Sequence, residues 1–163
     1  MSSTSHKFQD KMEITVEEYY QNQYYNVVQL IKELQKKIGK NQTKEIVRPL
    51  FEKMFVEWGK QEGKKNNINS LKAFADYDGS SFTQSHSHEV KELSSARYLS
   101  HVTECIMANV LRDMDAPEIG YDVLCNADFA CYEAMNPKLK LTRTKTLMQG
   151  DPYCDFLFTW EAD

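Results

Sequence analysis

Cys105 is the residue of this chain whose position most favours covalent chemistry. Residues 97–103 alternate between the two sides of a predicted strand, and residues 105–114 have the spacing of a short helix. Backbone amides at the start of a helix stabilise a thiolate, which is the nucleophilic form of cysteine. Cys105 is therefore a candidate catalytic residue, although a buried and inert thiol is the commoner role of a free cysteine.

A carboxylate and a second thiol share one face of the helix predicted over residues 117–135. Spacings of four, three and four residues place one set of side chains on one side of this helix: Tyr121, Cys125, Asp128 and Tyr132. The surrounding positions are apolar or small, so a carboxylate there needs a cation or a hydrogen-bond donor. Cys125 and Asp128 are candidate catalytic residues and Tyr121 is a candidate substrate contact. The alternative is that Asp128 accepts from a local backbone amide.

The C-terminal segment predicts a β-hairpin that brings cations to a third thiol. Residues 139–160 alternate on both sides of a Gly-Asp-Pro turn. A register with Leu147 opposite Cys154 turns Cys154, another candidate catalytic residue, inward. Arg143 and Lys145 then share that inner face and suit a ligand carboxylate, which arginine can bind with two hydrogen bonds. A slip of one residue would instead turn the threonines inward.

His101 is the histidine that we expect at the site, because it precedes Cys105 on the predicted inner strand and suits proton transfer. His86 and His88 would share one face of a strand, as in a two-histidine metal clip, but such pairs are more often solvated. The chain has no CxxC pair and no zinc-finger spacing. The common zinc-finger spacings are therefore absent. We expect no metal and no cofactor, and a zinc site on the thiolates of Cys105, Cys125 and Cys154 is a minor alternative.

The sequence pattern predicts one α+β domain over residues 13–163, after a loose tail over residues 1–12. N-terminal helices should pack on an antiparallel sheet with two inserted helices and a C-terminal hairpin. Thr15 and Glu18 have the spacing of a capping box, and Gly39 stands where the first helix should end. The predicted helices cover residues 15–38, 43–61, 68–76, 105–114 and 117–135, and the predicted strands cover residues 85–93, 97–103, 139–148 and 153–160.

Size and charge exclude several classes of function. The 163 residues suffice for one domain with its own core, and 20 basic against 24 acidic side chains give a net charge of −4. This balance argues against nucleic-acid binding, which needs a basic surface, and no apolar run approaches the ~20 residues of a membrane span. The polar N-terminal residues lack the apolar core of a signal peptide, so we expect a cytoplasmic protein with free thiols.

Several motifs follow one another in a recognisable order. Thr103-Glu104-Cys105 forms a Thr-x-Cys element, and the segment from Cys125 to Ala130 reads Cys-x-x-Asp-Phe-Ala. The later elements are Asn136-Pro137-Lys138, the segment from Arg143 to Asp151, and Tyr153-Cys154-Asp155-Phe156. Together they resemble the L-2-amino-thiazoline-4-carboxylic acid hydrolase family, and the resemblance covers most of the chain from about Val16.

The resemblance implies hydrolysis of a small-molecule substrate without a metal. The family's named reaction opens a 2-amino-thiazoline ring that bears a carboxylate, giving N-carbamoyl-L-cysteine. In that scheme Asp128 holds the cationic amidine or acts as a base on water, or else Cys105 attacks first, and Arg143 holds the carboxylate. The chain departs from the family at Phe156 and Leu157, where members often carry Arg or His.

Two other hypotheses belong to different classes. The chain has a fainter likeness to vinyl-reductase-type small-molecule-binding domains, which end in a similar pattern of Gly, Cys and aromatic residues. This likeness favours a non-enzymatic sensor with a closed apolar pocket and no water-accessible nucleophile. The third hypothesis is a structural or oligomerising protein, in which the Tyr-rich first helix forms the interface of a homo-oligomer.

Overall fold

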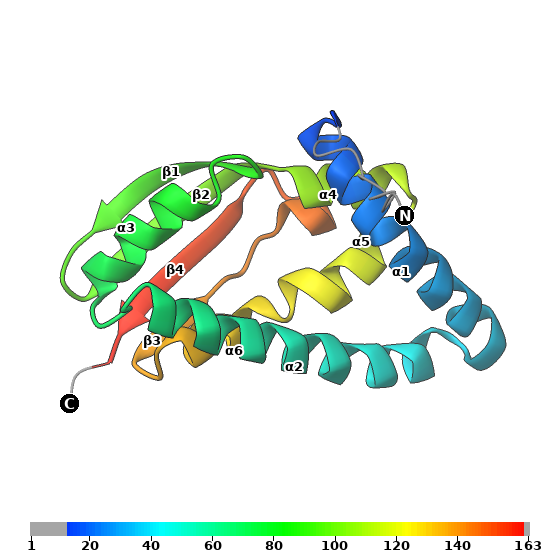
Figure 1. The fold of residues 1–163 in the computed structure, drawn as a ribbon, viewed down its shortest axis with the longest axis horizontal. Helices are drawn as coiled ribbons and strands as arrows, with labels where there is room; N and C mark the ends of the chain where they lie inside the picture. The colour runs from blue at the N-terminus through cyan, green and yellow to red at the C-terminus, as the bar shows by residue number, and fades with distance from the viewer. Residues whose placement is uncertain (1–12, 162–163) are drawn as a thin grey trace, which may run out of the picture.

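The computed structural model describes residues 13–161, and the tail predicted over residues 1–12 lies outside them. Helices pack on a four-stranded sheet (Figure 1). The helical elements are α1 (Val16–Ile38), α2 (Lys40–Lys65), α3 (Leu71–Ser81), α4 (Ile106–Asp113), α5 (Pro117–Gly120), η1 (Tyr121–Cys125), α6 (Asp128–Met135) and η2 (Leu147–Gln149). The strands are β1 (His86–Leu93), β2 (Arg97–Cys105), β3 (Leu139–Thr142) and β4 (Cys154–Trp160).

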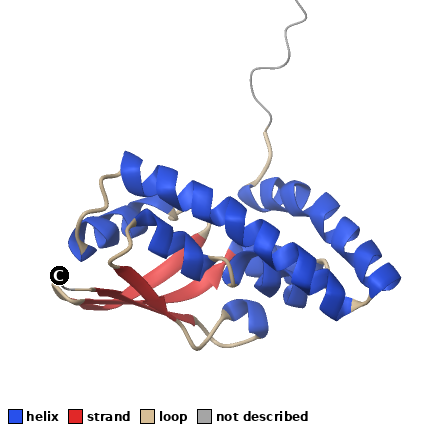
Figure 2. Cartoon of the chain, turned by 90° about the horizontal axis from the view of Figure 1, so that it is seen from below, coloured by secondary structure: helices blue, strands red, loops and turns tan. Residues whose placement is uncertain are grey.

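The sheet is antiparallel, with the strand order β1-β2-β4-β3. The long helices lie on one side of it (Figure 2), and α4, α5 and α6 come between β2 and β3 in the chain. The predicted class is therefore confirmed: an α+β fold with N-terminal helices, inserted helices and a C-terminal pair of strands. Within residues 13–161, no helix is long and apolar enough to cross a membrane.

Helix α1 begins and ends at the residues that the sequence predicts. The hydroxyl of Thr15 accepts from the amide of Glu18 at 3.1 Å, and the Glu18 carboxylate accepts from the amide of Thr15 at 2.8 Å. At the other end, Gly39 has a φ of 85°, a conformation that costs glycine little. The chain can therefore reverse direction at once, and α2 begins at Lys40.

Two glycines let α2 lie directly against the backbone of α6. A Cβ atom at Gly59 would come within 2.3 Å of the carbonyl oxygen of Cys131, and one at Gly63 within 2.1 Å of that of Met135. Such distances are too short for any side chain, so only glycine allows this approach. The contact holds α6, which begins with Asp128, close to the helical layer.

The continuous helix predicted over residues 117–135 is wrong, because a wide turn interrupts it. In η1 the amide of Asn126 donates to the carbonyl of Tyr121, five residues earlier, at 2.9 Å. Such a π-type turn holds more residues than an α-helical turn and shifts the face that each residue occupies. Tyr121 therefore leaves the face shared by Cys125 and Asp128.

The predicted strand over residues 139–148 is also wrong in extent, since β3 ends at Thr142. Beyond it, backbone amides bind carboxylates instead of a neighbouring strand. The Asp155 carboxylate accepts from the amides of Thr144 and Lys145 at 2.8 and 2.6 Å, and that of Asp151 accepts from Thr146 at 2.8 Å. These side-chain hydrogen bonds replace the backbone hydrogen bonds between strands, and the strand therefore ends.

The register of β3 against β4 differs from the prediction by two residues. Phe158 pairs with Leu141, whereas the predicted register placed it opposite Arg143. A shift by two residues preserves which side of the sheet each residue faces. Arg143 and Cys154 therefore keep the inward orientation that the sequence predicts, and Cys154 still contacts Leu147, whose amide donates to its sulfur at 3.2 Å.

We expect Gly63→Ala to destabilise the protein by about 3 kcal/mol, because the new methyl group must separate α2 from α6. The matched control is Gly79→Ala in α3, where a Cβ atom meets nothing within 4 Å. This second change should be neutral or stabilise by up to about 1 kcal/mol, as alanine favours a helix. Urea unfolding checks both, and equal stabilities would contradict the backbone contact.

Candidate functional site

A cavity of about 520 Å³ lies between the helical layer and the inner face of the sheet. This volume falls within the range of small-molecule sites. Its walls are largely apolar and aromatic, with contributions from Tyr24, Phe55, Trp58, Phe82 and Phe156. We call it the central cavity. It borders both clusters of the hydrophobic core, one around α4 and α5 and the other around α3 and β4.

Cys105 and His86 form a polar contact in the wall of the central cavity. They pair across β1 and β2, with Nε2 of His86 3.4 Å from Sγ of Cys105. The other ring nitrogen, Nδ1, lies 2.9 Å from the hydroxyl oxygen of Ser85. That hydroxyl donates to the carbonyl of Phe82 at 3.3 Å. We therefore assign the ring hydrogen to Nδ1, which leaves Nε2 as an acceptor for the Cys105 thiol.

Burial keeps both members of this contact uncharged. It raises the pKa of Cys105 to about 11, although amides of Met107 and Ala108 at the start of α4 act in the opposite direction. It also lowers the pKa of His86 to about 4, and the proximity of His88 adds to this effect. The helix amides therefore do not give a ready thiolate, because desolvation outweighs them. The resting pair is a thiol and a neutral imidazole.

An ion pair between a buried guanidinium and a partly buried carboxylate lines the same cavity. Nη1 of Arg143 donates to Oδ2 of Asp128 at 2.6 Å, and Nη2 donates to the carbonyl of Cys125 at 2.5 Å. The Arg143 side chain is only 2% exposed, and its guanidinium lies 5.2 and 4.8 Å from the ring centres of Phe129 and Phe156. Burial raises the pKa of the Asp128 carboxyl, and Arg143 opposes that rise.

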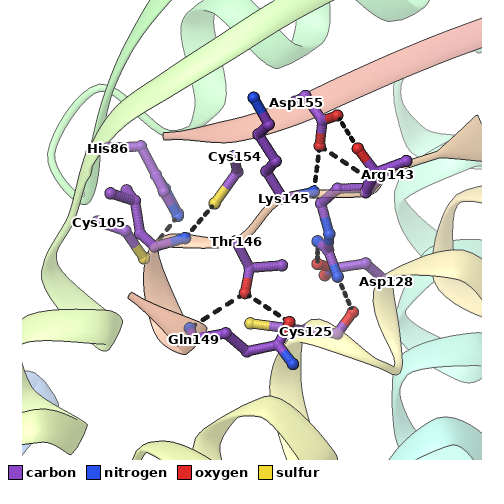
Figure 3. A network of polar contacts seen from close by, with 12 residues as sticks. His86, Cys105, Cys125, Asp128, Arg143, Lys145, Thr146, Gln149, Cys154 and Asp155 are labelled. Carbon is purple, nitrogen blue, oxygen red and sulfur yellow. Dashed lines mark hydrogen bonds and ion pairs between the residues drawn. The ribbon is translucent and has the colours of Figure 1, made fainter. Parts of the chain in front are cut away.

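Five of the eight predicted site residues line the central cavity: Cys105, Cys125, Asp128, Arg143 and Cys154. They come from the end of β2, η1, α6, the segment after β3, and the start of β4, as Figure 3 shows. Burial raises the pKa of Cys125 and Cys154, so both are thiols at neutral pH. Cys131, which is 2% exposed, also borders the cavity.

The other three predicted site residues lie elsewhere. The Lys145 ammonium extends away from Cys125 and Asp128 (Figure 3) to the hydroxyl of Tyr153 at 3.0 Å, because the strand has already ended. His101 stacks on Tyr153 with ring centres 4.1 Å apart, on the sheet face opposite its neighbours Ser100 and Val102. Tyr121 lines a separate polar hollow with Lys40 and Glu118, owing to the π-type turn.

His86 is the site residue that sequence reasoning missed. The sequence feature that could have revealed it is the short connection between β1 and β2, where Leu93 pairs with Tyr98. Counting outward from that pair places His86 opposite Cys105, as the structure has it. Within residues 13–161, no group of three or more His, Cys, Asp or Glu side chains is arranged to hold a metal ion.

The Asp128→Asn variant should lose about 3–5 kcal/mol of stability, because it leaves the Arg143 guanidinium buried without a counter-charge. The control is Asp76→Asn, which removes the exposed partner of Lys72 and should cost less than about 0.5 kcal/mol. Urea unfolding at neutral pH measures both. A cost for Asp128→Asn as small as that of the control would show that the ion pair is not an important constraint.

His86 should also make stability depend on pH. An unfolded imidazole titrates near pH 6.5, but burial lowers the pKa of His86 to about 4. Between these values the unfolded chain binds more protons, so the free energy of unfolding falls as the pH falls. From pH 7 to pH 4.5 the wild type should lose about 2 kcal/mol more than His86→Gln. A loss of equal size in His86→Gln would contradict the assignment of this pH dependence to His86.

Several solved structures share this fold, and two of them serve as examples. A trafficking protein particle complex subunit 3 from Naegleria fowleri, covalently bound to palmitic acid, has a TM-score of 0.56 and 11% identity, over 88% of this chain and 96% of that chain. The phenol-responsive sensory domain of the transcription activator PoxR, with phenol, has a TM-score of 0.50 and 14% identity, over 93% of this chain and 77% of that chain. At these identities the likeness establishes the fold alone.

Comparison with curated protein sequences finds no match. The sequence profile of one family, L-2-amino-thiazoline-4-carboxylic acid hydrolase, matches residues 19–158. The matched segment includes His86 and all five predicted residues that line the central cavity. On this match, the chain belongs to the L-2-amino-thiazoline-4-carboxylic acid hydrolase family.

Proposed function

We propose that the chain hydrolyses a small cyclic amidine of the 2-amino-thiazoline type in the central cavity, with Cys105 as the nucleophile and His86 as its base. The observation that carries the proposal is the 3.4 Å contact between the Cys105 sulfur and Nε2 of His86. Membership of the family supports hydrolysis as the reaction class. The 520 Å³ cavity supports a small molecule as the substrate.

The reaction proceeds in two steps. Cys105 attacks the amidine carbon as its proton passes to His86, and the bond from that carbon to the ring sulfur breaks. The leaving thiolate takes the proton from His86, which leaves the opened substrate attached to Cys105 as an isothiourea. Water then attacks the same carbon with His86 as base, and Cys105 leaves with its proton restored. The product carries a carbamoyl group.

The resting protonation states require proton transfer to accompany the attack. With a thiol pKa raised to about 11 and an imidazole pKa lowered to about 4, a separated thiolate–imidazolium pair is strongly disfavoured. A protonated amidine changes this balance, because its positive charge next to the sulfur favours the thiolate. The proposal therefore assigns activation of Cys105 to the bound substrate.

The Asp128–Arg143 ion pair reduces the expected importance of a substrate carboxylate. Arg143 already donates to Asp128 and to the carbonyl of Cys125, so a carboxylate must compete with a buried counter-ion. We infer that the amidine dominates binding. The Cys125 and Cys154 thiols then serve as walls rather than as further nucleophiles, since burial raises the pKa of each.

A ligand sensor is the second candidate function, and the apolar walls of the central cavity favour it. The four cavity cysteines all have raised pKa values, which is typical of inert buried thiols. The fold is shared with a phenol-responsive sensory domain. In this alternative, a small aromatic molecule occupies the cavity and no bond is broken.

Incubation with 2-amino-thiazoline-4-carboxylate and with 2-amino-thiazoline, followed by measurement of the released thiol, tests the hydrolase. We expect turnover of both compounds, with kcat/KM values within about tenfold of each other, since a lost contact to an already paired arginine costs about 1 kcal/mol. Cys105→Ser should lower kcat by about a thousandfold or more, and His86→Gln by about a hundredfold.

His101→Gln is the matched control, because His101 lies outside the central cavity and should leave both rates unchanged. Activity that persists in Cys105→Ser would remove this cysteine from the mechanism. Tight binding of phenol without turnover of either heterocycle would favour the sensor.

A further inference from the structure

Ser100 is a buried polar residue without a partner in the wall of the central cavity. Ser100 is 1% exposed, and its hydroxyl oxygen makes no hydrogen bond of ordinary geometry among residues 13–161, although the Tyr98 hydroxyl is near enough to interact with it. Ser100 pairs with Phe156 across β2 and β4, next to the pair of Tyr98 and Phe158, so its surroundings are aromatic. An unpaired hydroxyl is unfavourable in such surroundings. The position therefore suits a partner that the folded chain does not supply.

A buried carboxyl lies on the same side of the cavity. Asp78 of α3 lines the cavity, and its Oδ2 atom accepts from the Tyr98 hydroxyl at 2.8 Å. Tyr98 and Ser100 are two residues apart on β2 and share its inner face. Burial raises the pKa of Asp78, which favours the uncharged carboxyl group. We call Asp78, Tyr98 and Ser100 the serine corner.

We propose that the serine corner binds an uncharged hydrogen-bonding group of the ligand, a hydroxyl in the first instance, at the end remote from the carbon that meets Cys105. The proposal rests on the proposed function in taking the central cavity as the ligand site, a cyclic amidine as the ligand, and Cys105 as the residue that meets its reactive carbon. A hydroxyl can both donate and accept, so it can satisfy the Ser100 hydroxyl in either sense. A carboxylate would instead face Asp78.

The register of β2 sets the length of such a ligand. Cys105 and Ser100 are five residues apart on this strand, and a bulge lies between them. At about 3.3 Å per residue, the separation is about 13–16 Å. Subtracting a sulfur–carbon contact and one hydrogen bond leaves about 7–10 Å between the reactive carbon and the hydroxyl.

The residues that line the cavity between Cys105 and Ser100 indicate that an apolar group joins the two ends of the ligand. Val102 lies between Cys105 and Ser100 on β2, and Phe82 and Trp58 border the same cavity. A flat aromatic ring suits these neighbours. The predicted ligand class is therefore a cyclic amidine joined through an aromatic spacer to a hydroxyl group.

Two aromatic analogues that resist ring opening provide the test: 2-amino-4-(4-hydroxyphenyl)thiazole and 2-amino-4-(4-methylphenyl)thiazole. They differ only in the group that should reach Ser100. Titration calorimetry of the full chain should give a Kd about tenfold lower for the hydroxyl probe than for the methyl probe. In Ser100→Ala this ratio should fall to about one.

Thr43→Val is the matched control, since the buried Thr43 hydroxyl, in the first turn of α2, already donates to the carbonyl of Gly39 at 2.8 Å. Thr43→Val should lower the urea midpoint of unfolding and keep the tenfold ratio. Ser100→Ala should leave the midpoint unchanged or raise it, because the lost hydroxyl has no partner.

Several results would overturn the proposal: equal affinities in the wild type, no binding of either probe, or a tenfold ratio that persists in Ser100→Ala. A midpoint that falls as much in Ser100→Ala as in Thr43→Val would also overturn it, by revealing a structural role. Cys105→Ser should retain the tenfold ratio of the two Kd values whether or not the wild type turns over a substrate. If the wild type shows this ratio but turns over neither heterocycle, the result rejects hydrolysis and still supports ligand binding at the serine corner.

Discussion

The ion pair between Asp128 and Arg143 is the interaction on which the arrangement of the cavity depends. Asp128 begins α6, which two glycines of α2 hold close, and Arg143 follows β3 at the edge of the sheet. The pair therefore joins the helical layer to the sheet. Because Arg143 also binds the carbonyl of Cys125, it fixes the end of the π-type turn. A change at either residue would alter the wall that contains Cys125 and the position of Phe156.

A pair of this kind is weak evidence for stability, since desolvation of two charges offsets much of their attraction. Its geometry indicates a role in specifying one arrangement. The planar guanidinium lies near two aromatic rings while both of its terminal nitrogens are engaged, which a lysine at the same position could not reproduce. We infer that the pair keeps the cavity open and gives it a single shape. Because Asp128 balances the charge of Arg143, the cavity contains no uncompensated arginine.

The sequence predicted correctly the features that depend on residue spacing within one element. It failed for features that depend on contacts between several elements. The capping box of α1 and the face shared by Cys125 and Asp128 follow from local spacing. The end of β3 depends on Asp155, eleven residues after Thr144, so alternation alone extended the strand to Met148 and turned Lys145 inward. The π-type turn that displaces Tyr121 leaves no comparable pattern. His86 was within reach, since the short β1–β2 connection sets its register against Cys105.

The burial of the reactive groups connects the two candidate functions. With Cys105 protonated, His86 neutral and Arg143 paired with Asp128, these groups offer a ligand no unpaired charge, so apolar contact with the largely apolar walls favours uncharged molecules. Such a site suits small molecules whether or not it transforms them. In the proposed reaction, chemistry begins only when a ligand brings its own positive charge beside the Cys105 sulfur, because that charge shifts the thiol–imidazole balance in a buried site where electrostatic effects are strong. The distinction between a sensor and a hydrolase in this fold therefore rests on the ligand's electrophilic carbon and on its approach to one sulfur atom.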